Sequence, residues 1–256
     1  MFVGLRRNVA AWFCAAVLII ALPLAAWAME VQPLVIDLGG KGHGIASTFQ
    51  VTNRFDTPLP VEFRVHELSF REGGGLIPAS QPSNDLLVFP IQAVIEPGKT
   101  QNVRVQYVGD PVLARSKSYY VTVAQLPVPL KPGESGIQIL YNFQVLVSMA
   151  ARESAPAFAV SAVTRGKTQA GAPAIDLTVV NRGASYGYLS EGKFRLIERD
   201  ASGKEVARHV WERADMLQAV GTGIVGPGQS RTVAIPYETS SPTSQLSGEF
   251  EYEVRR

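Results

Sequence analysis

The sequence predicts an all-β protein made of two β-sandwich domains behind a short leader. Two observations predict this class. Short apolar or alternating segments are separated throughout by clusters of Gly, Pro, Asn and Asp, which is typical of strands joined by turns. No segment shows a convincing helical period. A third observation, a change to small and polar residues near position 150, divides the chain into two units.

The first 28 residues have the pattern of a cleaved secretion signal. Arg6 and Arg7 form a positive region, an apolar stretch follows, and small residues flank Trp27 at the expected cleavage site after Ala28. An uncleaved membrane anchor is the alternative, since the apolar run is almost long enough to span a bilayer. Pro23 and the small residues at its end favour cleavage. We therefore expect an exported chain that begins at residue 29.

Composition excludes several kinds of site from that exported chain. Its only cysteine, Cys14, lies in the leader, so no disulfide, thiolate nucleophile or cysteine metal site is expected. Arg6 and Arg7 are the leader's only charges, so the 24 Lys and Arg residues fall by these two to 22, equal to the 22 Asp and Glu. A net charge near zero argues against nucleic acid as a partner.

Strands are expected in the first unit, residues 29–150, at 32–37, 46–52, 59–68, 86–88, 102–108, 119–126 and 137–148. Seven strands in about 120 residues match the count of an immunoglobulin-like sandwich. The Cys…Trp…Cys core of antibody domains is absent, so the expected domain is free of disulfides.

The second unit, residues 151–256, begins with a linker that ends at Pro156. Strands are expected at 158–163, 174–180, 193–198, 205–210, 231–237 and 249–254. A short helix at 206–216 is the alternative to the strand at 205, because Val206, Val210 and Ala214 would share a face. The preceding Ser202-Gly203-Lys204 favours a hairpin turn and hence the strand.

Motifs that would indicate chemistry lack the context that chemistry requires. The segment 183–187 matches G-x-S-x-G around Ser185, but neither a following helix nor a suitably placed histidine is expected. The segment 221–226 matches G-x-G-x-x-G, yet Pro227 follows where a helix should begin. The three histidines, His43, His66 and His209, are not in metal-ligand spacing. No enzymatic activity, cofactor, metal or small-molecule substrate is therefore expected.

One segment is distinguished by its length and alternation. Large apolar residues occupy every second position from 137 to 147, namely Ile137, Ile139, Tyr141, Phe143, Val145 and Val147. Alternate residues of a strand face one side, so these six side chains would form one apolar row. A strand of this length would span about 36 Å, well beyond the usual five or six residues.

Three interpretations compete for this strand. It could be an ordinary central strand that fills its own domain's core. It could be an edge strand that pairs with another protein, since no lysine or proline guards it and strand addition is a known recognition mode. It could also support polymerisation into a fibre, which needs a second complementary site such as a detachable apolar arm. No such arm follows Ala28.

An ordered set of segments resembles the periplasmic chaperones of chaperone–usher pili, the PapD-like fimbrial chaperones. The set comprises 49–53, Phe89-Pro90, the turn 95–100, 103–105, 119–127 and the alternating strand 137–147. The resemblance covers nearly all of residues 30–256. It implies two immunoglobulin-like domains in a boomerang arrangement. It also implies that the alternating strand is lent to a pilus subunit whose own sandwich lacks a strand.

In the better-known members of that family, an arginine in the first strand and a lysine in the donor strand anchor the subunit's C-terminal carboxylate. Here residues 29–40 contain no Lys or Arg, and Asn142 occupies the position where we align the lysine. The chain therefore resembles the archaic, Csu-like branch more closely. Arg104 and Lys117 are the candidate anchors, because their strands are expected to pass the cleft between the domains.

We therefore expect a non-enzymatic periplasmic chaperone that caps pilus subunits by donor-strand complementation and delivers them to an outer-membrane usher. Pilus subunits and the usher are the expected partners, and the free protein could hide the same strand by self-association. The alternative is a structural pilin or adhesin of the cell surface, also built from two β-sandwich domains.

Overall fold

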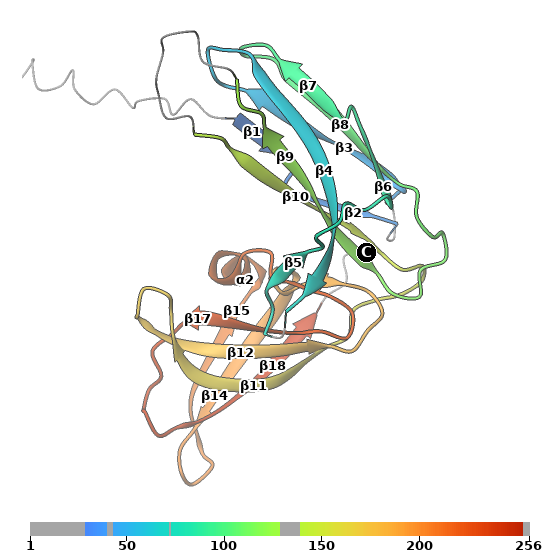
Figure 1. The fold of residues 1–256 in the computed structure, drawn as a ribbon. Helices are drawn as coiled ribbons and strands as arrows, with labels where there is room; N and C mark the ends of the chain where they lie inside the picture. Colours follow the sequence, from blue (N-terminus) through green and yellow to red (C-terminus); the bar gives the residue numbers. More distant parts are fainter. Residues whose placement is uncertain (1–28, 40–42, 72, 129–138, 253–256) are drawn as a thin grey trace, which may run out of the picture.

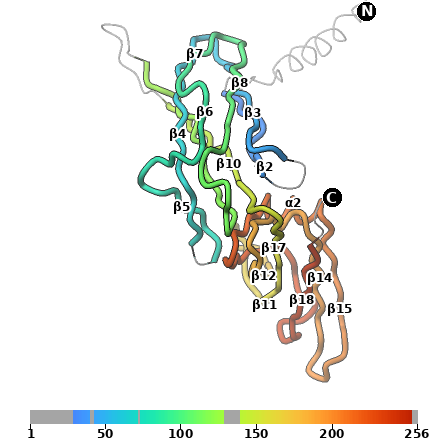
Figure 2. Tube along the Cα trace, turned by 90° about the vertical axis from the view of Figure 1, so that its right-hand side faces the viewer, coloured from blue at the N-terminus to red at the C-terminus, as the bar shows by residue number. Residues whose placement is uncertain are grey.

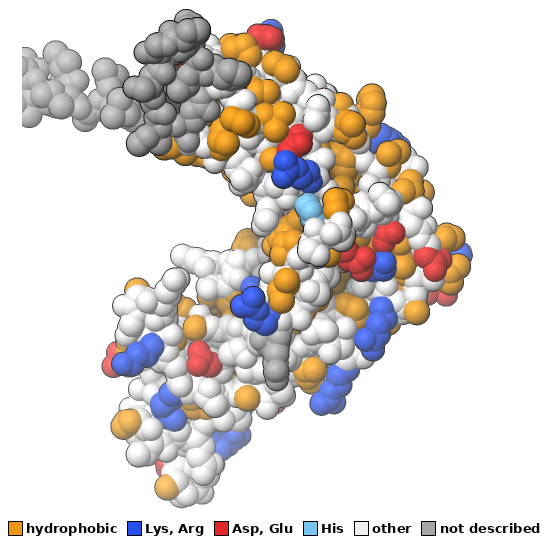
Figure 3. Space-filling view, in the orientation of Figure 1, with side chains coloured by type: hydrophobic (Ala, Val, Ile, Leu, Met, Phe, Trp, Pro, Cys, Tyr) orange, Lys and Arg blue, Asp and Glu red, His pale blue; other side chains and the backbone are white. Residues whose placement is uncertain are grey.

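The computed structural model describes residues 29–39, 43–71, 73–128 and 139–252, and the predicted leader lies outside them. The fold is all-β and consists of two β-sandwiches, as the sequence predicts (Figure 1). Among the described residues, no sheet combines strands from both sides of Ala150. The two sandwiches meet at an angle, so the molecule is bent like a boomerang and has a concave side (Figure 3).

The first sandwich is formed by two mainly antiparallel sheets. The first sheet has the order β1 (Met29–Gln32), β3 (Ala46–Asn53), β8 (Thr100–Tyr107) and β6 (Leu86–Phe89). The second has the order β2 (Val35–Leu38), β10 (Asn142–Met149), β9 (Lys117–Gln125), β4 (Leu59–Phe70) and β5 (Leu76–Pro78), with β7 (Gln92–Ile95) also paired to β4. β10 is thus the second strand from one end of this sheet, and β2 is the edge strand beside it.

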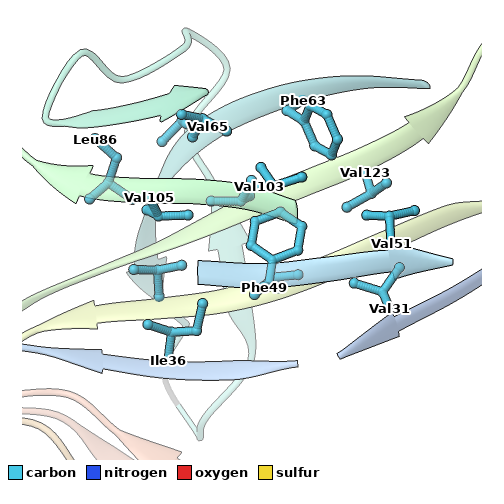
Figure 4. Close-up of a cluster of buried hydrophobic side chains, with 14 of the residues drawn as sticks. Val31, Ile36, Phe49, Val51, Phe63, Val65, Leu86, Val103, Val105 and Val123 are labelled. Carbon is cyan, nitrogen blue, oxygen red and sulfur yellow. The ribbon is translucent and has the colours of Figure 1, made fainter. Parts of the chain in front are cut away.

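Alternation along these strands creates the core between the sheets. Phe49 and Val51 of β3 point inward beside Val103 of β8, and Val123 of β9 faces them from the second sheet (Figure 4). All four are completely buried. The intervening residues of each strand face outward, as the two-residue period of a strand requires.

The first predicted strand, 32–37, is wrong in one respect. The chain leaves β1 at Gln32 and enters the other sheet as β2 at Val35. Pro33, which lies between them, has no N–H to donate to a sheet ladder, and this explains why one continuous strand does not form.

The second sandwich contains three groups of strands. One sheet has the order β11 (Phe158–Lys167), β12 (Pro173–Asn181) and β17 (Ser230–Pro236). The facing sheet has the order β15 (Glu205–Trp211), β14 (Gly192–Arg199) and β18 (Gln245–Tyr252). A short pair, β13 (Gly187–Tyr188) and β16 (Ile224–Val225), lies next to the short 3-10 helix η1 (Leu189–Glu191).

The region 205–220 contains both a strand and a helix, the two alternatives that the sequence left open there. The strand is confirmed as β15, but a helix, α2 (Arg213–Val220), follows it and was not expected there. Asp215 accepts a hydrogen bond from the backbone N–H of Glu212, which stabilises the first turn of the helix. Of the helix residues only Met216 is fully buried. The apolar face of the helix is therefore narrow, and the sequence shows no clear helical period there. None of the described helices has the length and apolar character needed to cross a membrane.

Candidate functional site

β10 has one fully paired edge and one partly open edge. It pairs antiparallel with β9 along its whole length, from Asn142 opposite Ala124 to Met149 opposite Lys117. On its other side, β2 pairs with β10 only from Leu146 onward. Among the described residues, no strand pairs with the first half of β10 on that side. We call this half, Asn142–Val145, the open edge.

The register shows which backbone groups are free along the open edge. The N–H of Gln125 donates to the C=O of Tyr141 at 3.0 Å, so odd-numbered residues here direct their backbone groups toward β9. The N–H of Leu146 instead donates to Leu34 at 2.9 Å, toward β2. By this alternation, the N–H and C=O groups of Asn142 and Gln144 point away from β9 and have no strand partner in the described chain. They are available to another strand.

The predicted apolar row is shorter and less uniform than expected. The strand begins at Asn142, so the prediction of a continuous strand from 137 is wrong, and Ile137 lies outside the described residues. Eight residues span about 26 Å. Ile139 is 70% exposed and Tyr141 is 37% exposed, in the segment that precedes β10.

The later members of the row face their own domain. Val145 and Val147 are completely buried in the core of the first sandwich, and Phe143 packs against that core. The interpretation of an ordinary core strand therefore holds for the second half of β10. The exposed apolar side chains just before the open edge are those of Ile139, Leu140 and Tyr141.

Polar contacts fix the two sandwiches to each other. The hydroxyls of Tyr186 and Tyr188 donate to one oxygen of Asp37, at 2.5 and 2.7 Å. Burial strongly raises the pKa of both tyrosines, and the neighbouring carboxylate adds to the effect. In addition, Ser116 donates its backbone N–H to Ala184, and its hydroxyl accepts the N–H of Tyr186. These contacts join β2 and the start of β9 to the β12–β13 loop.

The hairpin of β4 and β5 extends from the first sandwich onto the second (Figures 1 and 2). Near its tip, Gly73 accepts the backbone N–H of Thr232 at 3.0 Å. The ring of Phe70 lies against Gly226, where a Cβ would be 2.4 Å from the ring. Only glycine fits there without displacing the hairpin. The G-x-G-x-x-G segment thus ends in a contact between the two sandwiches.

The other motif match, around Ser185, also lies at this junction. Ser185 is buried, and its backbone oxygen accepts a hydrogen bond from Asn181. Gly183 is packed against the linker backbone at Ala155. The segment is a buried loop that fixes the linker, and this accounts for its glycines without any catalytic role.

Lys117, one of the two predicted anchors, already has two acidic partners. Its Nζ lies 2.9 Å from Asp85 and 3.2 Å from Glu67. The hydrogen bond to Asp85 raises the pKa of Lys117, burial opposes the rise, and Glu67 supports it. The same hydrogen bond, with one from Tyr119, lowers the pKa of Asp85. Two carboxylates around one ammonium leave a net negative charge, so this cluster would repel a further carboxylate.

Arg104, the other predicted anchor, is on the far side of the first sandwich. It belongs to β8 and lies on the exposed outer face, where its guanidinium donates to the side-chain oxygen of Gln106 at 3.4 Å. β8 and β10 are in opposite sheets, so this face points away from the sheet that carries the open edge. The expectation that the strand of Arg104 brings it past the cleft is wrong.

The position of Asn142 is also not the one that the alignment implied. Asn142 begins β10, whereas the chain enters the second sandwich beyond Met149 at the other end. Toward the junction, β10 carries Leu146, which shares an apolar cluster with Tyr186 and Ile224, and Ser148, which hydrogen-bonds Ser118. Neither carries a charge.

A different cation lies at the junction. Arg231 is the second residue of β17, its guanidinium donates to the backbone oxygen of Ile224 at 2.9 Å, and its stem lies against Gly74 of the hairpin. The sequence held no signal for it, because an isolated arginine at the start of a strand in the second unit has no pattern. Only the fold brings it to the first sandwich.

Comparisons by sequence identify no relative: no family model matches the chain, and no curated protein matches it. Solved structures do match its fold. The class 5 fimbriae chaperone CfaA matches with a TM-score of 0.53 at 10% identity, over 89% of this chain and 100% of that one. The chain has the fold of the fimbrial chaperones.

Two further matches come from complexes. A chain from a chaperone–tip adhesin complex of CFA/I fimbriae biogenesis matches with a TM-score of 0.52 at 10% identity, over 88% of this chain and 98% of that one. One from the archaic CsuC–CsuE complex of Acinetobacter baumannii matches with a TM-score of 0.47 at 11% identity, over 81% and 90%. The two matches with a TM-score above 0.5 extend over both sandwiches, so the fimbrial-chaperone fold is shared along both, and the archaic branch stays a prediction.

Proposed function

We propose that this protein is a periplasmic chaperone of the chaperone–usher family that caps pilus subunits through the open edge of β10 and delivers them to an outer-membrane usher. The single observation that carries the proposal is the open edge itself, with unpaired backbone groups at Asn142 and Gln144 next to exposed Ile139 and Tyr141. A strand that lacks a neighbour is a ready template for another chain. The shared fold supports the same conclusion.

The burial of the predicted donor residues supports different roles for them. Ile139 and Tyr141 would enter the subunit's core, and Ile137 stays a predicted member of the same row. Val145 and Val147 would contribute only through the rigidity of β10, because their side chains fill the first sandwich. Phe143 is shared between the two roles, since it is partly buried against that core.

The energy of burying these side chains supports a binding mode in which the main chain contributes as much as the side chains. Full burial of a large apolar side chain contributes roughly 1.5–3 kcal/mol, so Ile139 and Tyr141, already partly covered, contribute about 2–3 kcal/mol together. The entropy lost on association exceeds this amount. Backbone pairing along the open edge and contacts elsewhere in the concave side must supply the remainder. Because burial of the subunit drives capping, no ATP site is required.

The same edge accounts for the proposed self-association. Two free molecules could pair through their open edges and so protect Ile139 and Tyr141 from water. Such a dimer and a captured subunit would compete for one edge, so subunit binding should convert any dimer into a one-to-one complex.

The test is co-expression with secreted pilus subunits in the periplasm, followed by recovery of the complex. Ile139→Asp and Tyr141→Asp place a charge on exposed side chains and should abolish recovery while the chaperone stays folded. Leu87→Asp is the matched control, because Leu87 is 55% exposed but lies on the outer face of the opposite sheet. Equal recovery with all three variants would show that subunits bind elsewhere. A pilin or adhesin would instead polymerise without any partner.

A further inference from the structure

The second sandwich has a cleft between the edge strands of its two sheets. β15 and β17 each lie at one end of their sheet, and α2 contacts both of them. α2 lies at the end of this sandwich that is nearer the first one (Figures 1 and 2). The cleft has a volume of about 540 Å³ and is lined by all three elements, with His209 and Trp211 from β15, Asp215 and Gln218 from α2, and Pro236 from β17. We call it the aromatic cleft.

Three aromatic rings are grouped at one wall of the aromatic cleft. The ring centroid of His209 lies 4.2 Å from that of Trp211 and 5.4 Å from that of Tyr237, which follows β17. The centroids of Trp211 and Tyr237 are also 5.4 Å apart. Phe194 of the core stacks on Trp211, and the hydroxyl of Tyr237 donates to the buried Glu198 at 2.9 Å. The rings of Trp211 and Tyr237 are thus held in position before any ligand binds, and His209 beside them is exposed.

The aromatic cleft also holds polar groups that the chain does not use. Of its lining residues in the described chain, only Asp215 has a full charge at neutral pH. One oxygen of this carboxylate accepts the backbone N–H of Glu212 at 3.0 Å, but among the described residues no Lys or Arg forms an ion pair with it. The indole N–H of Trp211 has no acceptor in the described chain, and it is not one of the completely buried polar atoms. A carboxylate and an N–H donor are therefore available to a ligand.

These groups suit one chemical class of ligand, a polypeptide segment with a cationic side chain. A lysine ammonium or an arginine guanidinium pairs with a carboxylate and is attracted to the faces of aromatic rings. The charge of Asp215 disfavours an anion. A metal ion offers no acceptor to the N–H of Trp211, whereas a peptide backbone offers its carbonyl oxygens. In addition, the outer edges of β15 and β17 have no strand partner in the described chain, so an extended segment has backbone groups to pair with.

We propose that the aromatic cleft binds an extended segment of another polypeptide through a Lys or Arg side chain, which packs against the rings of His209 and Tyr237 and pairs with Asp215. A carbonyl oxygen of the segment's backbone accepts the N–H of Trp211. The site lies within the second sandwich and uses neither the open edge nor the contacts between the sandwiches. It is therefore a second binding site, and it does not depend on the capture of pilus subunits by the open edge.

The sequence provides a direct reporter for this site. Trp12 and Trp27 precede residue 29, so Trp211 is the only tryptophan of the chain from residue 29 onward. The probe is a blocked seven-residue peptide of alternating threonine and valine with arginine at its centre. The matched peptide carries citrulline there, which has nearly the same shape but no charge. The arginine peptide should shift the fluorescence emission of Trp211 in a saturable manner and bind about tenfold more tightly than the citrulline peptide.

Variants of Asp215 test the source of this preference. Asp215→Asn keeps an acceptor for the N–H of Glu212 but removes the charge, so it should reduce the tenfold ratio to less than about twofold. Asp215→Glu keeps the charge at a longer reach and should retain part of the ratio. Glu251→Gln is the matched control, because it removes an exposed charge from β18, at the opposite edge of the sheet that contains β15, and should leave the ratio unchanged. If Asp215→Asn weakens both peptides equally, the carboxylate only stabilises α2 and the proposal is overturned.

Further outcomes separate the aromatic cleft from the open edge. Equal binding of the arginine and citrulline peptides, or no binding of either by titration calorimetry, overturns the proposal. Tyr141→Asp disrupts the open edge but should leave the affinity for the arginine peptide unchanged, because the aromatic cleft lies in the other sandwich. If Tyr141→Asp abolishes peptide binding, the peptide occupies the open edge instead, and the proposed site is wrong.

Discussion

The hydroxyl of Tyr186, in the second sandwich, donates a 2.5 Å hydrogen bond to the carboxylate of Asp37, in the first. Tyr188 donates to the same oxygen, and both rings are almost completely buried. The rings contact each other edge to face, with centroids 5.5 Å apart. One carboxylate thus fixes the hydroxyls of two buried tyrosines, and this contact helps set the angle of the concave side.

Asp37→Ala should therefore weaken the junction more than it weakens either sandwich. It leaves two buried hydroxyls without an acceptor, at a cost on the order of 2–4 kcal/mol. Thermal denaturation should show a lower midpoint, and small-angle X-ray scattering should show a wider range of shapes. Asp56→Ala, which removes an exposed aspartate, is the control. An unchanged scattering profile for Asp37→Ala would contradict a role in fixing the angle.

Gln144→Pro tests whether main-chain pairing along the open edge binds the subunit. Proline removes an N–H that β9 does not use, and edge strands tolerate proline, so stability should change by no more than about 1 kcal/mol. Subunit affinity should fall at least tenfold. Gln144→Ala removes the same side chain but keeps the N–H, so it should bind normally. Equal affinities of the two variants would mean that side chains alone hold the subunit.

Glu198 should make the second sandwich sensitive to acid. This carboxylate is completely buried; burial raises its pKa, but hydrogen bonds from Ser244, Ser240 and Tyr237 outweigh burial and hold the pKa below its ordinary value of 4.5. Its stabilising contribution is therefore present above pH 4.5 and is lost as the pH falls through the lowered folded-state pKa.

Glu198→Gln should accordingly lower the free energy of unfolding by about 1–3 kcal/mol at pH 7, because an amide accepts fewer of these bonds. The difference in the free energy of unfolding between Glu198→Gln and the natural protein should shrink below pH 4. Urea denaturation at several pH values measures it. Glu238→Gln, at an exposed position in the loop that carries Ser240 and Ser244, should have little effect at any pH. A difference that stays constant with pH would rule out the carboxylate as its source.

Gly226→Ala should disturb the hairpin contact. The added Cβ would lie 2.4 Å from the ring of Phe70, so the hairpin must move, at a cost on the order of 1–3 kcal/mol. Adding Phe70→Leu should recover part of the lost stability, because the smaller side chain makes room. Gly44→Ala, where the nearest atom to the new Cβ is 4.0 Å away, serves as the control. The denaturation midpoints of the single and double variants are compared. If the stability effects of Gly226→Ala and Phe70→Leu simply add, the two residues are not in direct contact.

The local sequence pattern was sufficient to predict the fold class and the positions of most strands. Phe49 and Val51 alternate with polar residues, and the same period recurs in β4, β8 and β9, so the inward faces could be identified before the partners were known. Pattern was insufficient for α2, whose single fully buried residue gives almost no period. It also failed at Pro33, where the chain changes sheets.

The candidate site was predicted in part. Ile139 and Tyr141 belong to the predicted apolar row and are exposed beside the open edge, and their role in binding stays a proposal. Val145 and Val147 have the same alternation but face the core, because apolar period alone does not say whether a core belongs to one chain or two. Lys117 and Arg104 were chosen as cations on suitable strands, yet a charge is useful only where its neighbours leave it unbalanced.

The sequence by itself determined that this protein is built of strands, which side of each strand faces inward, and that one late strand of the first unit has an unusual apolar row. Tertiary structure decided which half of that strand is free, because β2 returns from the start of the chain to cover Leu146 and the residues after it. It also brought Arg231 of the second sandwich against Gly74 of the β4–β5 hairpin. Both are contacts between residues far apart in the chain, and the physical forces that create them depend on distance in space, which a local pattern does not contain.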